Sequence, residues 1–276
     1  MGVTGSLLAR LLEASGLSFT WHDSEAERVS WKAATGAVYP CQDEPGQRDL
    51  EEWQSWLGAG GYFAGEPWCE EADYWSVFVK PGASPKPLKL ASTPSVHVNS
   101  QVLVRSTRQR FASFRRIEEE KADYSIIAHG FNSRMQFTHW GWSGLVELSS
   151  RLPAGNGRRP CIYYRKGSLM FYAYPVPGRP EAHYAGSSII RQKLGKEHSL
   201  VLTPKYETWQ KHFGDLAKVS VGRILEPLVE GWRPAMESGE KDTSVLAEGN
   251  RLTVPPLDTN GIRRFPSVWR NLLKEL

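Results

Sequence analysis

The sequence lacks several features that would point to a particular class of protein. Its three cysteines, Cys41, Cys69 and Cys161, form no CxxC pair, which argues against a zinc ribbon or a disulfide framework. No apolar run approaches the roughly 18 residues that a membrane-spanning helix needs. The first residues also lack the basic and then apolar pattern of a signal peptide. We therefore expect a cytoplasmic protein with no membrane span.

An excess of one charge is also missing. The chain has 34 Lys and Arg against 30 Asp and Glu, a net charge of +4. The short basic clusters between residues 105 and 116 lie next to Glu118, Glu119 and Glu120, as on an ordinary solvated surface, so no nucleic-acid partner is expected. No metal-ligand spacing and no GxSxG sequence is present, which argues against a metal site and against a hydrolase.

The chain is long enough for a packed core, and its 40% hydrophobic and 23% charged residues are ordinary for a globular protein. Leucines recur at helical spacing in residues 5–15, and Gly16 follows as a helix end. In the next segment Leu17, Phe19 and Trp21 alternate with polar residues up to Asp23, which predicts a strand. The predicted opening is helix, glycine turn, strand.

The rest of the chain predicts alternating elements and then an antiparallel part. Residues 40–75 are interpreted as loops with one short helix from Asp49 to Leu57. In the plainer interpretation His139, Trp140 and Trp142 pack within a loop. Further strands are predicted at 77–90, at 95–104 with a turn, at 122–130, 161–164, 169–174, 183–191, 223–229 and 251–254. Further helices are predicted around Phe111 and Phe114, at 205–219, and from Pro266 to Leu276, because proline is tolerated at the first helical position.

The most informative pattern lies at the start. Gly2-Val-Thr-Gly5 opens the first helix, and Asp23 follows 18 residues after Gly5 at the end of the next strand. This matches the second half of the dinucleotide-binding fingerprint GxGxxG. Glycine lets the backbone approach a diphosphate, free N–H groups at the helix start bind its charge, and the carboxylate of Asp23 can accept hydrogen bonds from ribose.

The first half of that fingerprint is not in the sequence, because Met1 directly precedes Gly2. We hypothesise that Met1 occupies a variable slot of the fingerprint, and that the first glycine and its strand lie upstream. A truncated gene product is the alternative. Without that strand, its two neighbours in the sheet would lose their backbone partners.

The order of motifs resembles the FAD-dependent oxidoreductases of the D-amino-acid oxidase and glycine/sarcosine oxidase superfamily. Four segments carry the resemblance: residues 2–23, Ala122–Gly130, Glu230–Pro234 and Thr259–Arg263. The resemblance implies FAD as the cofactor. It also implies a diphosphate site at Gly2, Thr4, Gly5 and Ser6, a ribose contact at Asp23, and flavin contacts at Thr35, Gly36, Gly130, Gly261 and Ile262.

The resemblance further implies a substrate site. Arg233 is similar to the arginine that holds a substrate carboxylate, a task for which its planar fork is suited. Tyr164, Tyr172 and Tyr174 are candidates for the substrate tyrosine, and Tyr174 is our choice. Arg263 departs from the family, whose members often have a small residue there. In the plainer interpretation Arg233 pairs with Glu230 and the tyrosines are ordinary sheet aromatics.

The sequence thus predicts an α/β fold: a Rossmann-like FAD-binding domain with an inserted, mainly antiparallel substrate domain. Its expected divisions are residues 1–150 (FAD-binding domain), 151–234 (antiparallel substrate domain) and 235–276 (return to the FAD-binding domain with the last helix). The expected reaction is hydride transfer from an amine or amino-acid-like small molecule to flavin. The alternatives are a flavin monooxygenase on the same fold and a non-catalytic nucleotide-binding protein.

Overall fold

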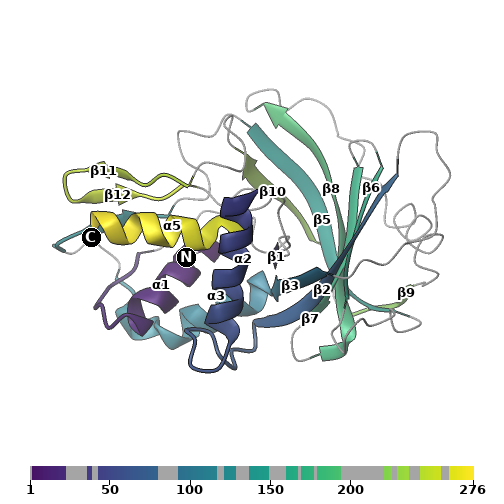
Figure 1. Cartoon of the computed structure of the whole chain (residues 1–276), viewed down its shortest axis with the longest axis horizontal. Coiled ribbons are helices and arrows are strands. Elements are labelled where there is room, and N and C mark those ends of the chain that lie inside the picture. Colours follow the sequence, from purple (N-terminus) through teal and green to yellow (C-terminus); the bar gives the residue numbers. More distant parts are fainter. Residues whose placement is uncertain are drawn as a thin grey trace.

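The computed structural model describes residues 2–22, 36–38, 43–79, 93–116, 121–128, 137–148, 160–166, 169–176, 179–193, 221–225, 229–235, 243–255 and 261–276. Helices gather on one side of the molecule and a large curved sheet on the other (Figure 1). Both chain ends lie on the helical side. None of the helices within the described ranges is long and apolar enough to cross a membrane.

Among the described residues, four α-helices make up the helical side: α1 (Val3–Ala14), α2 (Glu44–Leu57), α3 (Ser100–Arg110) and α5 (Gly261–Glu275). A short 3-10 helix, Ala112–Phe114, follows α3. Side chains that cap the helix N-terminus explain where two of these helices begin. The side chain of Asp43 accepts from the N–H of Gly46 ahead of α2, and that of Asn99 accepts from the N–H of Val102 ahead of α3.

The described part of the chain forms a large sheet of nine strands. Their order is β1 (Gly36–Val38), β3 (Thr93–Val98), β2 (Cys69–Val79), β6 (Pro160–Lys166), β7 (Leu169–Val176), β8 (Arg179–Lys193), β5 (Phe137–Leu148) and β10 (Val229–Ala235), and β9 (Val221–Ile224) also pairs with β5. All pairs are antiparallel except β2 with β6. β1 and β3 lie nearest the helices, so this edge joins the two sides of the molecule (Figure 1).

A second sheet lies beside α5. It contains β11 (Leu246–Glu248), β12 (Arg251–Thr253) and β4 (Ser125–Ile127), in that order. β11 and β12 form a hairpin whose turn includes Gly249, with φ of +62°. β12 runs parallel to β4, although more than a hundred residues separate the two strands in the chain. This second sheet is therefore built from segments that lie far apart in the sequence.

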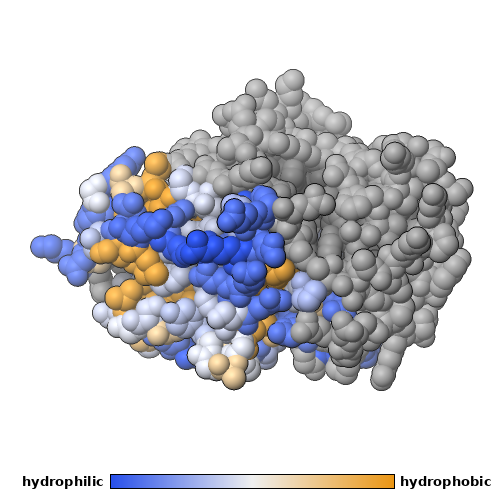
Figure 2. Space-filling model, in the orientation of Figure 1, coloured by the Kyte–Doolittle hydropathy of each residue, from blue (hydrophilic) through white to orange (hydrophobic). Residues whose placement is uncertain are grey.

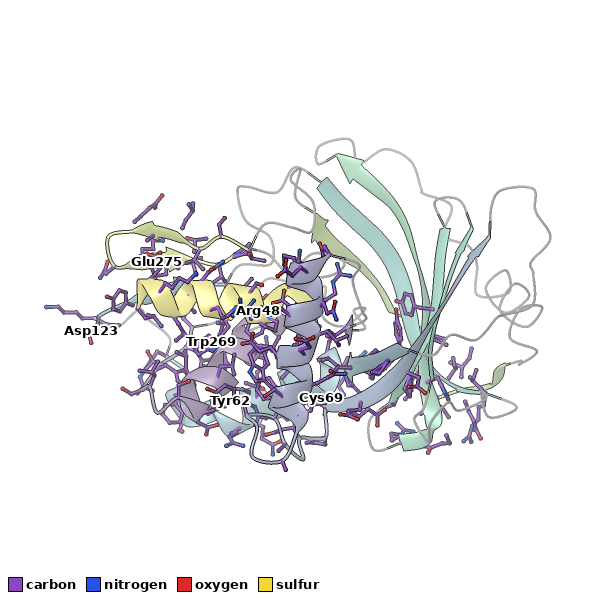
Figure 3. The ribbon with its side chains drawn as sticks, in the orientation of Figure 1. Arg48, Tyr62, Cys69, Asp123, Trp269 and Glu275 are labelled. Atoms are coloured by element: carbon purple, nitrogen blue, oxygen red, sulfur yellow. The ribbon has the colours of Figure 1, made fainter. Side chains whose placement is uncertain are left out.

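The main core lies between the helices and the β1–β3 edge. Its largest fully buried side chains include Trp53, Trp68 and Phe63, and leucines of α1 and residues of α5 complete it. Trp269 is buried on the side of α5 that faces α1 (Figure 3). On the surface, a hydrophilic band follows α5 and α2, with small separate apolar patches beside it (Figure 2).

Several predicted elements are confirmed. The first helix, the strands within 161–191 and the strand at 251–254 match α1, β6, β7, β8 and β12. The strand predicted at 122–130 is shorter, and only Ser125–Ile127 is paired. Residues 17–22 form no strand of their own; Trp21 alone makes a parallel bridge, to Arg115. The helix predicted at 205–219 lies outside the described residues.

Four predictions about local structure are wrong. The strand predicted at 95–104 ends at Val98, and Asn99 then caps α3. Consequently Phe111 and Phe114 follow that helix rather than lying on it. Residues 139–142 belong to β5, where partners on both sides supply hydrogen bonds that the local sequence does not reveal. Cys69 begins β2 within a segment interpreted as loop.

The last helix also begins earlier than predicted. Pro266 does not start it; α5 begins five residues before, at Gly261, and Pro266 lies inside. The nine-stranded sheet likewise takes strands from both sides of position 150, with β5 next to β8. The division into residues 1–150, 151–234 and 235–276 remains a prediction.

Candidate cofactor-binding site

The N-terminus of α1 is open and uncapped. Gly2 is its N-cap residue in an extended conformation, no side chain caps the helix, and no acidic residue lies in the first turn. The first helical hydrogen bond runs from the N–H of Ser6 to the carbonyl of Gly2, at 2.9 Å. The N–H groups of Val3, Thr4 and Gly5 therefore have no partner within the helix and carry its positive dipole end.

The surroundings of this helix end leave room for a ligand. A Cβ atom added at Gly2 would meet no atom within 4 Å. Ser6 is fully buried, and its Oγ has no hydrogen-bond partner among the described residues. A buried hydroxyl without a partner is costly, and a bound polar group would relieve that cost. These features are compatible with a bound anion, and the diphosphate site at this helix end stays a prediction.

Gly36 and Ile262, two of the predicted flavin contacts, lie against each other. A Cβ at Gly36 would be 2.5 Å from Cδ1 of Ile262 and 3.1 Å from Val98. Gly36 lies in a β-strand and has no positive φ, so close packing rather than an unusual φ favours glycine here. The structure thus brings β1 of the large sheet into direct contact with the first turn of α5.

The first turn of α5 is held by α2. The indole N–H of Trp53 donates to the carbonyl of Ile262 at 2.9 Å. In a regular helix that carbonyl would accept from the N–H of residue 266, and Pro266 has none. Trp53 supplies the missing donor, which explains how the helix can extend past its proline to Gly261.

A buried carboxylate binds side chains from the first three turns of α5. Asp49 of α2 is fully buried and accepts from Ser267 at 2.7 Å, Arg270 at 2.8 Å and Arg264 at 3.4 Å. Arg264 also reaches Asp43 at 3.3 Å. Because each of these contacts joins α2 and α5, the two helices are expected to move as one unit.

Tyr174, our choice for the substrate tyrosine, lies in a stack of rings. It is 5% exposed and stacks with the ring of His97, whose centroid is 5.6 Å away, and with the ring of Tyr172, at 5.0 Å. The stack links β3 to β7 across the large sheet. Tyr174 is therefore fixed in place, close to the edge that carries Gly36.

Arg233, the predicted carboxylate ligand, lies in β10 opposite His139 of β5. Tyr174 is opposite Tyr184 of β8, which in turn is opposite Leu145 of β5. Measured along the sheet, the backbones of Arg233 and Tyr174 are thus three strand spacings and six residues apart, roughly 25 Å. The strand register does not place the two residues next to each other.

Three predicted contacts, Asp23, Thr35 and Gly130, lie outside the described residues. Arg263, noted as a departure from the family pattern, is buried. Sequence reasoning missed the roles of Trp53, Asp49 and Asn99. Asn99 could have been found, because asparagine directly before Ser-Gln-Val-Leu is a helix-start signal.

Two buried ionisable groups lie beside this region. Burial raises the pKa of the Cys69 thiol, and nearby Glu66 and Glu70 add to the effect. Burial lowers the pKa of Arg10, an effect that Glu66 opposes at 2.8 Å. Cys69 lies where the helices meet the sheet (Figure 3). The described residues contain no group of three or more side chains that could hold a metal ion.

No protein-family model and no curated protein matches the chain. Solved structures do match it over nearly its whole length. Glycine oxidase from Geobacillus kaustophilus is 12% identical with a TM-score of 0.65, covering 99% of this chain and 91% of the oxidase. Iminodiacetate oxidase from Chelativorans is 13% identical with a TM-score of 0.61, covering 98% of this chain and 91% of the oxidase.

Two further structures extend the comparison. An FAD-dependent oxidoreductase from Pseudomonas aeruginosa is 12% identical with a TM-score of 0.61, covering 99% of this chain and 88% of the other. A mutant of the halogenase PltM, solved in complex with FAD, is 14% identical with a TM-score of 0.55, covering 99% of this chain and 67% of the halogenase. The chain therefore has the mixed helix and sheet fold of FAD-dependent oxidoreductases. Among the structures that share it are glycine and iminodiacetate oxidases, as the resemblance in sequence predicted.

Proposed function

We propose that the protein binds FAD and oxidises an amine or an amino-acid-like small molecule. The observation that carries the proposal is the pairing of an uncapped helix N-terminus at Gly2 with the contact between Gly36 and Ile262, in a chain that shares its fold with glycine oxidase. Three assignments belong to the same proposal: a Rossmann-like arrangement of the cofactor domain, the division at residues 150 and 234, and a cytoplasmic location.

The residues present suit the two ends of the cofactor. Gly2, Thr4, Gly5 and Ser6 would hold the diphosphate, because free N–H groups, open space and an unpartnered buried hydroxyl meet there. Gly36, Gly261 and Ile262 would lie by the flavin ring. When bound, FAD supplies the chemistry by accepting a hydride from the substrate carbon.

The protein's task is then to orient the substrate and to stabilise charge. The first-turn N–H groups of α5 would favour negative charge near the flavin carbonyl. Arg233 would pair with a substrate carboxylate through two parallel hydrogen bonds. The strand register keeps Tyr174 apart from Arg233, so Tyr174 would line the substrate domain from the stacked position that it shares with His97 and Tyr172, without a direct contact to the group that Arg233 holds. Asp23, Thr35 and Gly130 complete the proposed set.

The first test is the visible absorption spectrum of the purified protein. We expect a two-band flavin spectrum, either as purified or after FAD is added to the apoprotein. A panel of glycine, sarcosine, iminodiacetate and simple amines should then bleach it without oxygen. In Arg233→Ala the KM of carboxylate substrates should rise at least tenfold while amines without a carboxylate are unaffected. A folded protein that takes up no FAD would refute the proposal.

A flavin monooxygenase is the second candidate. It is supported by the structural alignment with the halogenase PltM, solved with FAD, which covers 99% of this chain. The same spectrum separates the two candidates: a reduced nicotinamide cofactor, NADH or NADPH, should bleach the flavin of a monooxygenase, and an amine should bleach the flavin of an oxidase. Bound flavin that neither reductant bleaches would favour the third alternative, a nucleotide-binding protein without catalysis.

A further inference from the structure

Helices α1 and α3 lie parallel, with their N-termini at the same end. Nε of Arg10 donates to Oγ1 of Thr107 at 3.1 Å, and three residues further along each helix Nε of Arg110 donates to Oε1 of Glu13 at 3.0 Å. Both contacts join residues 97 positions apart in the chain. The same offset places Val3 level with Ser100, and Gly2 level with Asn99.

Parallel alignment is electrostatically unfavourable at this end. Each helix N-terminus carries about half a positive charge, and packed helices lie roughly 8–10 Å apart. No acidic residue lies in the first turn of either helix. An anion bound at this end would offset the repulsion between the two helix dipoles.

The same end also holds buried polar groups that need partners. Asn99 and Ser100 are each 1% exposed. Oδ1 of Asn99 accepts from the N–H of Val102 at 3.1 Å, but its Nδ2 and the Oγ of Ser100 have no hydrogen-bond partner within the described parts of the chain. The buried Oγ of Ser6 in α1 also has no hydrogen-bond partner among the described residues. It lies one turn before Arg10, on the face that contacts α3.

These observations, together with the proposed function on which this step rests, point to a ligand site shared by two helices. We infer that Asn99 and Ser100 of α3 bind the cofactor together with the N-terminus of α1, and that the two helix ends hold the diphosphate and the hydroxyl groups next to it. A single phosphate is too small to contact two helix ends roughly 8–10 Å apart, whereas a diphosphate with its adjoining sugar oxygens can span them.

Two substitutions test the inference. Asn99→Asp keeps the acceptor that caps α3 but replaces the Nδ2 donor with a negative charge. Ser100→Ala removes only the hydroxyl. Ser106→Ala is the matched control, because it changes the same residue type in the same helix, away from its N-terminus. Dissociation constants for FAD and for ADP would be measured by calorimetry, alongside thermal unfolding of each apoprotein.

We expect Ser100→Ala to weaken FAD binding about threefold to tenfold and Asn99→Asp more than tenfold, because hydrogen bonds to charged groups are the stronger ones. Ser106→Ala should bind like the wild type. Weaker binding of ADP as well would assign the contact to the diphosphate. Weaker binding of FAD alone would assign it to the adjoining sugar alcohol. If Asn99→Asp does not fold, Ser100→Ala decides alone.

Unchanged affinity in both variants, with wild-type protein that binds FAD, would overturn the shared site and leave the proposed function intact. Wild-type protein that binds no FAD would refute the proposed function. In that case ADP and inorganic pyrophosphate become the probes of the shared site, and wild-type protein that binds neither would overturn the inference as well.

Discussion

The indole N–H of Trp53 lies 2.9 Å from the carbonyl that Pro266 leaves without a helical donor. A proline inside a helix normally costs about 3 kcal/mol, partly through that lost hydrogen bond. Here a side chain from another helix replaces it, so α5 continues to Gly261. The first turn of α5, which the proposed function places by the flavin, therefore depends on α2.

This relationship predicts coupling between the two residues. Trp53→Phe removes the N–H and should lower the free energy of unfolding by about 1 kcal/mol for the hydrogen bond, plus the cost of the smaller ring. In a Pro266→Ala background the chain regains its own donor, so the same substitution should cost less. A double-mutant cycle by urea unfolding measures this difference. Additive effects would mean that the indole does not replace the proline's missing donor.

The contact between Gly36 and Ile262 predicts a clash that a second substitution can remove. Gly36→Ala places a methyl group 2.5 Å from Cδ1 of Ile262 and should destabilise the protein by about 1–3 kcal/mol. Ile262→Val lacks that Cδ1 atom and should recover most of the loss in the double variant. Thermal unfolding of the four proteins tests this. Failure of Ile262→Val to rescue would assign the strain to Val98 instead.

The buried carboxylate of Asp49 predicts a large effect from a small change. Asp49→Ala leaves Arg264 and Arg270 without their shared partner and should cost about 3–5 kcal/mol. Glu52→Ala is the control. It removes a partly exposed carboxylate that also pairs with Arg270, and should cost about 1 kcal/mol or less. Equal losses in the two variants would contradict the role given to Asp49.

The two arginines between α1 and α3 should also contribute unequally to stability, because one is buried and the other is half exposed. Arg10 is buried against Glu66, Thr107 and Ser106, so Arg10→Ala should cost about 2–4 kcal/mol. Arg110 is half exposed and pairs with exposed Glu13, so Arg110→Ala should cost about 1 kcal/mol or less. Chemical denaturation of both variants compares them directly, and a larger loss at Arg110 would reverse the ranking.

The thiol of Cys69 gives the stability a defined pH dependence. Its pKa in the folded protein is raised above its ordinary value of 9.0, so above about pH 9 the unfolded chain loses a proton that the folded chain keeps. Stability should therefore fall with rising pH, by about 1.4 kcal/mol per pH unit from this group. Cys69→Ala should have a shallower slope by that amount between pH 9 and 10.5. Identical slopes would show that Cys69 ionises freely in the folded state.

The sequence by itself determined the local features of this protein. Leucine spacing and Gly16 defined α1, alternation and turns defined β6 to β8, and Gly2-Val-Thr-Gly5 marked the start of α1. Each of these depends on neighbours within a few residues, which a sequence pattern records directly. The resemblance to FAD-dependent oxidoreductases also came from the order of such local motifs, and the fold agrees with it.

Only the tertiary structure decided the features that depend on contacts with residues far away in the chain. Pro266 lies inside α5 because Trp53, more than two hundred residues earlier, donates to its helix. Residues 139–142 form a strand because β8 and β10 flank them. The pairing of α1 with α3 follows from contacts between residues 97 positions apart. A hydrogen bond of this kind stabilises an element whose own sequence carries no sign of it, so no local pattern could have predicted it.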